Sequence, residues 1–72
     1  MNEIVFSVEV DEEGGYVAVS TLENGSIVTQ GDTLPELEFM IADAIEGYFF
    51  DNPDQKPKAV RLQFAQEKKS LS

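Results

Sequence analysis

Apolar side chains recur at every second position in the first of three β-rich stretches of the N-terminal half, and the three stretches predict three β-strands. The first stretch covers residues 3–10 and has apolar side chains at every second position: Ile4, Phe6, Val8 and Val10. Residues 16–21 and 27–30 are two further β-rich stretches. Gly14-Gly15 separates the first stretch from the second, and Asn24-Gly25 separates the second from the third; both pairs favour tight turns. We therefore expect three consecutive strands joined as a meander.

A helical pattern follows the third stretch, from about residue 34 to about residue 50. At 100° per residue, one face of this helix carries the following apolar side chains: Leu34, Leu37, Met40, Ile41, Ala44, Ile45 and Tyr48. Thr33 has the hydroxyl of a good N-cap, and Glu36 can reach back to the Thr33 N–H and complete a capping box. Pro53 cannot continue a helix, so the helix should end before it.

Residues 59–64 alternate again and predict a fourth strand, with Val60, Leu62 and Phe64 on one face. The expected order is β-β-β-α-β. The simplest way to bury these apolar faces is an α+β fold of two layers, in which one helix packs on one face of an antiparallel sheet. We expect a single domain over residues 1–66, followed by a polar tail at residues 67–72.

The charge of the chain is concentrated by sign. Fourteen acidic and five basic residues give a net charge of −9, and the first 55 residues contain thirteen of the acids and no Lys or Arg. Such a surface repels phosphates, so we expect no specific nucleic-acid binding by this chain alone. It would steer a basic protein toward itself, although a charge that only maintains solubility is an equal alternative. No apolar run is long enough to span a bilayer, and we expect a cytoplasmic protein with no membrane contact.

The residue types needed for catalysis are scarce. The chain contains no His or Cys, so the usual general bases and nucleophile pairs are missing. Asp11, Glu12 and Glu13 are consecutive turn residues, which more often solvate a turn than converge on a metal ion. We expect no enzyme, no catalytic residue, no cofactor and no metal site.

Two large aromatic residues, Phe39 and Phe50, fall on the helix face opposite the predicted core. Three acidic residues share that side: Glu36, Asp43 and Glu46. Exposed apolar groups surrounded by charge are typical of a protein interface, so these five residues are the interface candidates. In the alternative, the helix end bends and Phe50 packs under the C-terminal segment.

Three motifs together resemble the N-terminal domain of HicB-type antitoxins over residues 4–50. They are Asp11-Glu12-Glu13-Gly14-Gly15-Tyr16, Thr29-Gln30-Gly31-Asp32-Thr33 and Ala44-Ile45-Glu46-Gly47-Tyr48. The motif residues with a structural role are Gly14, Gly15, Tyr16, Gly31, Asp32 and Thr33. The resemblance implies a β-β-β-α-β fold likened to a truncated RNase H fold, which agrees with the predicted order.

The resemblance also implies a function. HicB-type domains bind and neutralise a small basic HicA-type toxin, an mRNA interferase, and many carry a C-terminal DNA-binding module. This chain resembles a short form without that module. Its second hairpin has residues 20–25 where a Pro-Asp-Leu-Pro-Gly-type segment is common. The alternative is a solitary oligomeric scaffold or ligand-sensing domain with no toxin partner.

Self-association is the last expectation from the sequence. A domain of this size has a thin core, and no disulfide can reinforce it. No proline lies within residues 4–10 or 27–30, so neither strand is protected against pairing at a sheet edge. We expect a homodimer, or a higher homo-oligomer, formed through the sheet.

Overall fold

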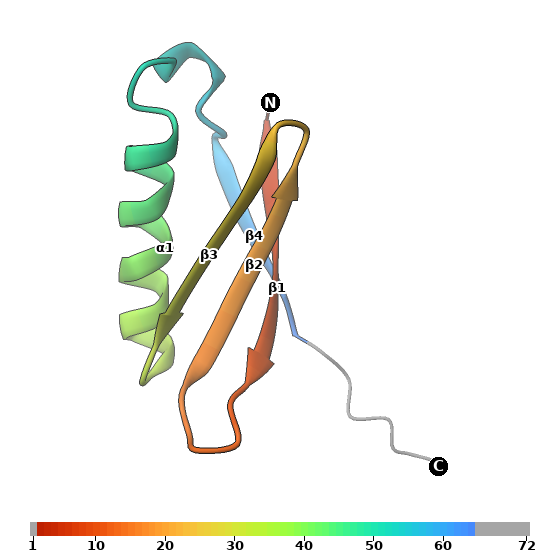
Figure 1. The fold of residues 1–72 in the computed structure, drawn as a ribbon. Helices are drawn as coiled ribbons and strands as arrows, with labels where there is room; N and C mark the ends of the chain where they lie inside the picture. The colour runs from red at the N-terminus through yellow and green to blue at the C-terminus, as the bar shows by residue number, and fades with distance from the viewer. Residues whose placement is uncertain (1, 65–72) are drawn as a thin grey trace.

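The protein folds into two layers, a four-stranded sheet with one long helix on one face (Figure 1). The computed structural model describes residues 2–64, so the predicted tail at residues 67–72 lies outside the described residues. The elements in chain order are β1 (Glu3–Val10), β2 (Tyr16–Leu22), β3 (Gly25–Gly31), α1 (Leu34–Tyr48), the 3-10 turn η1 (Pro53–Gln55) and β4 (Ala59–Phe64). The predicted α+β class and the β-β-β-α-β order are confirmed. Within residues 2–64, no helix combines the length and the apolar character needed to cross a membrane.

The strand order across the sheet is β3-β2-β1-β4. β1 pairs antiparallel with β2, and β2 with β3, as the meander predicts. β4 pairs parallel with β1, so the prediction of a wholly antiparallel sheet is wrong and the sheet is mixed. The cause is α1, which carries the chain back along the sheet from the end of β3 (Figure 1). β4 therefore starts at the end where β3 starts and runs in the same direction as β3 and β1.

The core lies between α1 and the sheet. Alternate residues of β1 and one stripe of α1 are buried, as their periods predict. The buried apolar side chains are Ile4, Phe6, Val8, Ala18, Ile27, Leu37, Ile41, Ile45 and Phe49. Full burial of each larger side chain contributes about 1.5–3 kcal/mol to stability.

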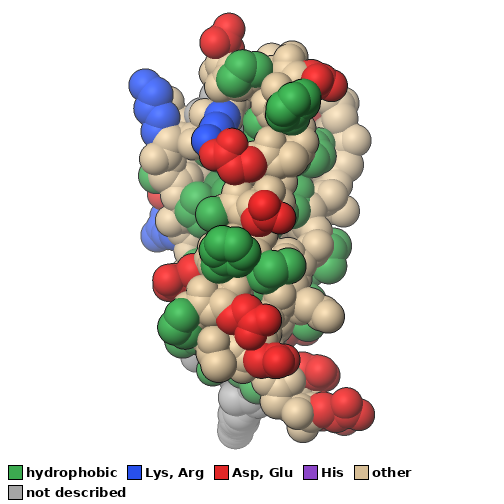
Figure 2. All heavy atoms as spheres, turned by 90° about the vertical axis from the view of Figure 1, so that its left-hand side faces the viewer, with side chains coloured by type: hydrophobic (Ala, Val, Ile, Leu, Met, Phe, Trp, Pro, Cys, Tyr) green, Lys and Arg blue, Asp and Glu red, His purple; other side chains and the backbone are tan. Residues whose placement is uncertain are grey.

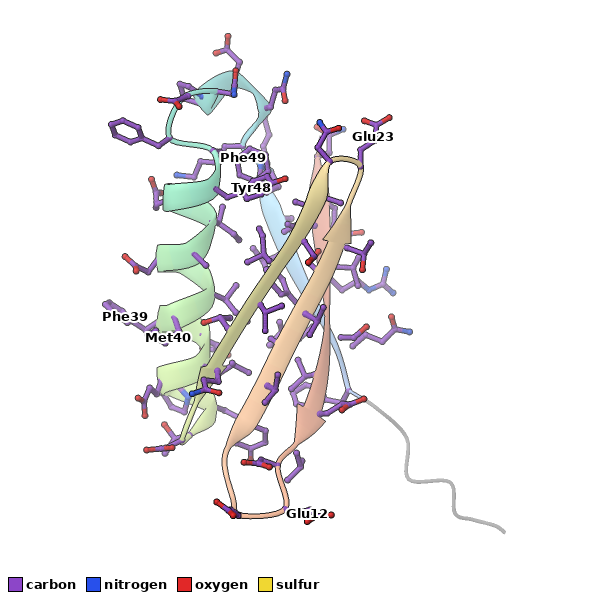
Figure 3. All side chains as sticks on the ribbon, viewed as in Figure 1. Glu12, Glu23, Phe39, Met40, Tyr48 and Phe49 are labelled. Carbon is purple, nitrogen blue, oxygen red and sulfur yellow. The ribbon has the colours of Figure 1, made fainter. Side chains whose placement is uncertain are left out.

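The ends of the predicted apolar faces differ from the structure. Leu34, Tyr48 and Val10 are exposed, whereas Phe49, which follows the helix, is buried. The helix ends at Tyr48, and the backbone of Phe49 leaves helical geometry there (φ −102°, ψ 19°). This turn directs the Phe49 ring into the core, where it packs edge-to-face against Tyr48 with ring centroids 5.0 Å apart (Figure 3).

The apolar face of β4 is only partly covered. Val60, Leu62 and Phe64 lie beside Ile4, Phe6 and Val8 in the parallel register and share their face of the sheet. α1 packs on this same face but over β3 and β2, toward the opposite edge of the sheet. Val60 is therefore 47% exposed, Phe64 is 45% exposed and Leu62 is half-buried. The prediction that this face belongs to the core is wrong for Val60 and Phe64.

The junction of β3 and α1 depends on a close backbone approach at Gly31. A Cβ atom on Gly31 would lie 2.6 Å from the Leu37 nitrogen and 2.8 Å from the Leu37 Cα. Gly31 has no positive φ angle, so this small distance, and not turn geometry, requires glycine. The first turn of α1 rests directly on the end of β3.

This contact predicts opposite effects for two Gly-to-Ala substitutions. Gly31→Ala should lower the free energy of unfolding by about 1–3 kcal/mol, because the new methyl group displaces the Leu37 backbone. Gly47→Ala should raise it by at most about 0.5–1 kcal/mol, because Gly47 lies in the exposed last turn of α1 with nothing within 4 Å of the added Cβ. Urea denaturation followed by circular dichroism measures both changes. Equal effects of the two substitutions would contradict the contact.

Candidate protein-binding surface

The predicted interface residues form a line along the outward side of α1 and the turn after it. They recur at intervals of three and four residues: Glu36, Phe39, Asp43, Glu46 and Phe50. Phe39 is 69% exposed and Phe50 is 80% exposed. The side of the molecule formed by α1 shows hydrophobic side chains among carboxylates, and Phe39 points away from the sheet (Figures 2 and 3). The exposure of both rings is confirmed, and the alternative in which Phe50 packs under the chain is wrong.

The three carboxylates on this line have different environments. Glu46 forms an exposed ion pair with Lys56, which follows η1. Glu36 accepts the backbone N–H of Asp32 through Oε1, at 3.2 Å. Among residues 2–64, no hydrogen bond or ion pair reaches the Asp43 carboxylate. Asp43 is therefore the carboxylate on this line that a cationic side chain of a partner could meet without displacing another group.

The helix start confirms one half of the predicted capping box and corrects the other. The Thr33 hydroxyl accepts the Glu36 N–H at 3.2 Å, as predicted. The Glu36 side chain reaches the N–H of Asp32 instead of that of Thr33. Thr33 itself has an extended backbone (φ −131°, ψ 165°), as an N-cap residue usually does. Glu36 thus stabilises the helix entry, which limits what it offers a partner.

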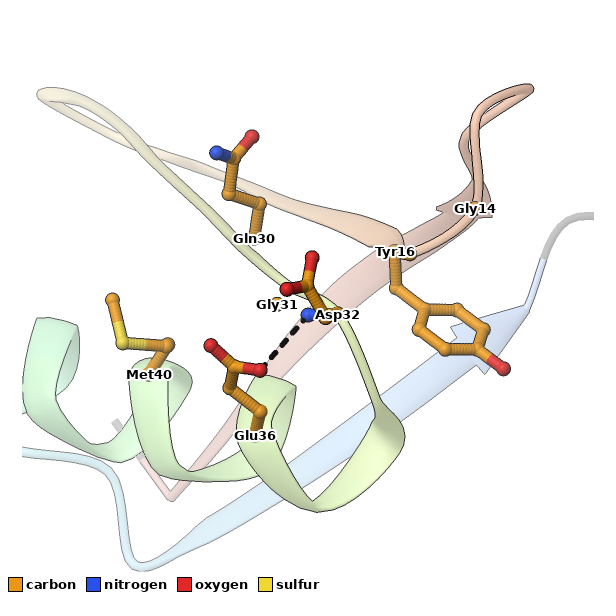
Figure 4. Close-up of a pocket in the computed structure, with 8 residues that line it drawn as sticks. Gly14, Tyr16, Gln30, Gly31, Asp32, Glu36 and Met40 are labelled. Carbon is orange, nitrogen blue, oxygen red and sulfur yellow. Dashed lines mark hydrogen bonds between the residues drawn. The ribbon is translucent and has the colours of Figure 1, made fainter.

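Residues of the first two motifs meet at one end of the molecule. The cavity there has a volume of about 300 Å³ and is lined by Glu36, Met40 and six motif residues: Gly14, Gly15, Tyr16, Gln30, Gly31 and Asp32 (Figure 4). Tyr16 is the cross-strand neighbour of Gly31. Gly15 has a φ of +89°, and a Cβ on it would lie 3.1 Å from the Gly31 oxygen. These glycines allow the β1–β2 turn, the end of β3 and the start of α1 to pack closely.

The cavity offers mainly hydrogen-bond acceptors. The side chains of Gln30, Asp32, Glu36 and Met40 surround the same space, whereas the ring of Tyr16 points away from it (Figure 4). Among residues 2–64, no group of three or more Asp or Glu side chains lies where it could hold a metal ion. The arrangement provides carboxylate and amide oxygens that could accept hydrogen bonds from a cation or an amide.

One comparison with known proteins identifies the family. The chain is 42% identical over 65 residues to a UPF0150 protein of Thermotoga maritima, and the alignment covers 90% of this chain and 86% of that protein. The chain belongs to the UPF0150 family. No protein-family model matches the chain, and no solved structure matches it.

Two residues of this UPF0150 surface were missed by reasoning from the sequence. Met40 was expected in the core, but it is half-buried and lines the cavity beside the outward face. The sequence did contain a signal: Met40 lies only 100° around the helix from Phe39, so it is close to the outward face. The sequence pattern gave Lys56 no role, and the structure pairs it with Glu46. No spacing rule connects two residues on either side of a turn, so only the fold reveals this pair.

The cap of α1 gives a prediction specific to this family member. Thr33→Ala should lower the free energy of unfolding by about 1 kcal/mol, because the Glu36 N–H loses its acceptor. Thr33→Ser keeps the hydroxyl and should remain close to the wild-type value. Thermal or urea unfolding of the three proteins provides the comparison. Equal stability of the Ala and Ser variants would show that the cap contributes nothing.

Proposed function

We propose that this UPF0150 domain is a non-enzymatic, HicB-like antitoxin domain that acts in the cytoplasm. It binds and neutralises a small basic HicA-type mRNA interferase. The observation that carries this proposal is the exposed ring of Phe39 between Glu36 and Asp43 on the outward side of α1. The resemblance of the sequence motifs to HicB-type domains supports it, and so does the packing of the first two motifs around one junction of the fold.

Charge favours a basic partner. The first 55 residues contain thirteen acids and no Lys or Arg, so the negative potential extends over β1, β2, β3 and α1. Such a potential accelerates encounter with a positively charged protein and disfavours acidic ones. A ribonuclease needs a basic surface to hold RNA phosphates. An acidic domain seated on that surface competes directly with the RNA.

Phe39 and Asp43 are the best-placed contacts of the helix face. Large aromatic side chains often dominate binding energy when a partner fully buries them. Asp43 lies one turn after Phe39 on the same side of α1 and can accept a charge-assisted hydrogen bond from Lys or Arg. Glu46 is already paired with Lys56 and has a smaller role in this proposal.

Binding to a HicA-type mRNA interferase encoded beside the gene of this chain tests the function. Phe39→Ser should weaken binding by about 30-fold, which corresponds to roughly 2 kcal/mol, because it removes a buried aromatic contact. Val28→Ser is the matched control, since Val28 on β3 is 64% exposed and lies on the face of the sheet opposite α1. Isothermal titration calorimetry measures the affinities, and recovery of growth on co-expression measures neutralisation. Unchanged binding by the Phe39 variant, or no binding by the wild-type chain, would contradict the proposal.

The proposed role also predicts that the chain alone does not bind double-stranded DNA specifically. Its acidic body repels phosphates, while the basic residues between Lys56 and Lys69 permit weak attraction at low salt. Fluorescence anisotropy with DNA from upstream of the gene should show no saturable, sequence-dependent signal at physiological salt. A saturable signal that an unrelated duplex fails to compete away would contradict this prediction.

An oligomeric scaffold with no toxin partner is the second candidate function. The open apolar face of β4 favours it, because this face is available for assembly whether or not a toxin exists. The neighbouring gene distinguishes the two functions. A short basic reading frame with a Gly-rich N-terminal segment and a single His favours the antitoxin, and its absence favours the scaffold.

A further inference from the structure

The two edges of the described sheet are β3 and β4. β1 was expected to be an available edge, but β4 covers it and places it inside the sheet. An edge strand presents unpaired backbone N–H and C=O groups that a second strand can satisfy. The two edges differ in their charge and in their exposed apolar surface, and these differences decide which edge pairs.

The β3 edge is poorly suited to meet another copy of this chain. Its inner face is covered by α1, so pairing there would bury little additional apolar surface. Acidic residues also surround it: Glu23 precedes the strand, Asp32 follows it and Glu36 lies beside its end. Two copies that meet at β3 would bring these carboxylates together at close range.

The β4 edge has the opposite properties. The cations of the described residues are Lys56, Lys58 and Arg61, and all three lie within β4 or just before it. Val60, Leu62 and Phe64 leave apolar surface open on the helix side. A groove of about 210 Å³ continues this surface to α1, lined by Glu38, Ile41, Ala42, Val60 and Leu62. This edge is where two chains of charge −9 can approach with the least repulsion.

We propose that the protein forms a closed two-fold dimer in which β4 pairs antiparallel with β4 of a second copy, centred on Leu62. Antiparallel pairing about Leu62 places Val60 opposite Phe64 of the partner subunit. Arg61 then faces Gln63 of the partner subunit, so no two cations are directly opposed. Within each chain, Arg61 also lies 3.9 Å from Glu3.

The dimer joins the two sheets into one of eight strands with both helices on the same face. The apolar side chains of the two β4 strands form a continuous surface between the helices and cover both grooves. The pairing uses neither Phe39 nor Asp43, so the outward face of α1 stays accessible in each subunit. This assembly is independent of the proposed toxin binding, and either proposal can fail without the other.

Sedimentation equilibrium of the full chain at micromolar concentration provides the test. The wild type should have twice the 8.0 kDa mass of one chain in moderate salt. Its dissociation constant should fall as salt rises from low to physiological ionic strength. Salt screens the repulsion between the two negatively charged chains, and the Debye length is about 8 Å at physiological ionic strength. Leu62→Lys should shift the mass to that of one chain. Val60→Lys, at a more exposed position, should do the same and guards against unfolding of the Leu62 variant.

Val28→Lys is the matched control, because it places the same charge on the exposed face of the other edge strand. It should leave the dimer intact, and circular dichroism should show that all variants are folded. A wild-type mass of one chain would overturn the inference. So would a dimer that Val28→Lys dissociates while the Leu62 and Val60 variants remain dimeric, because this result would place the interface at the β3 edge. Mass that grows without limit with concentration would also overturn it, since head-to-tail pairing of β3 with β4 does not close.

Discussion

The contact between Gly31 and the first turn of α1 determines how the two layers of this protein meet. With no side chain on Gly31, the Leu37 backbone lies directly on the end of β3, and the Leu37 side chain becomes fully buried. The Thr33 cap and the Glu36 carboxylate hold the helix entry in that position. The position of the first turn then sets the path of the rest of the helix, because a helix is stiff over this length.

The path of α1 explains both exposed surfaces. It lies over β3 and β2, so its inner side chains cover one half of the sheet and leave the face of β4 partly open. Its outer side carries Phe39 and Asp43, which have no contact role in the core. The two surfaces also differ in charge. The helix face belongs to the acidic part of the chain, whereas the β4 edge holds the cations of the described residues.

This separation would allow the proposed binding and the proposed assembly to coexist in a chain of this size. A basic partner would meet the acidic face of α1, and a second copy would meet the β4 edge. The glycines of the first two motifs belong to neither surface. Gly15 and Gly31 allow the β1–β2 turn, the end of β3 and the first turn of α1 to pack closely, so they help to maintain the fold that presents both surfaces.

The sequence by itself determined the features that depend on local spacing. Alternation located β1 and β4, and β-rich runs beside turn signals located β2 and β3. The 3.6-residue period located α1 and the exposure of Phe39, and the Thr33 hydroxyl identified the cap. These follow from steric and hydrogen-bonding rules that act over a few residues. The resemblance to HicB-type domains singled out Gly14, Gly15, Tyr16, Gly31 and Asp32, but only the structure shows that these five residues line one cavity.

Only the tertiary structure decided the features that depend on distant segments. The parallel pairing of β4 with β1, the partial exposure of Val60 and Phe64, and the Lys56–Glu46 ion pair all follow from where α1 returns the chain. The core contains Phe49 and not the predicted Tyr48, because the helix ends at Tyr48 and the chain turns there. Periodicity shows which side chains share a face of an element, but it does not specify which neighbour covers that face.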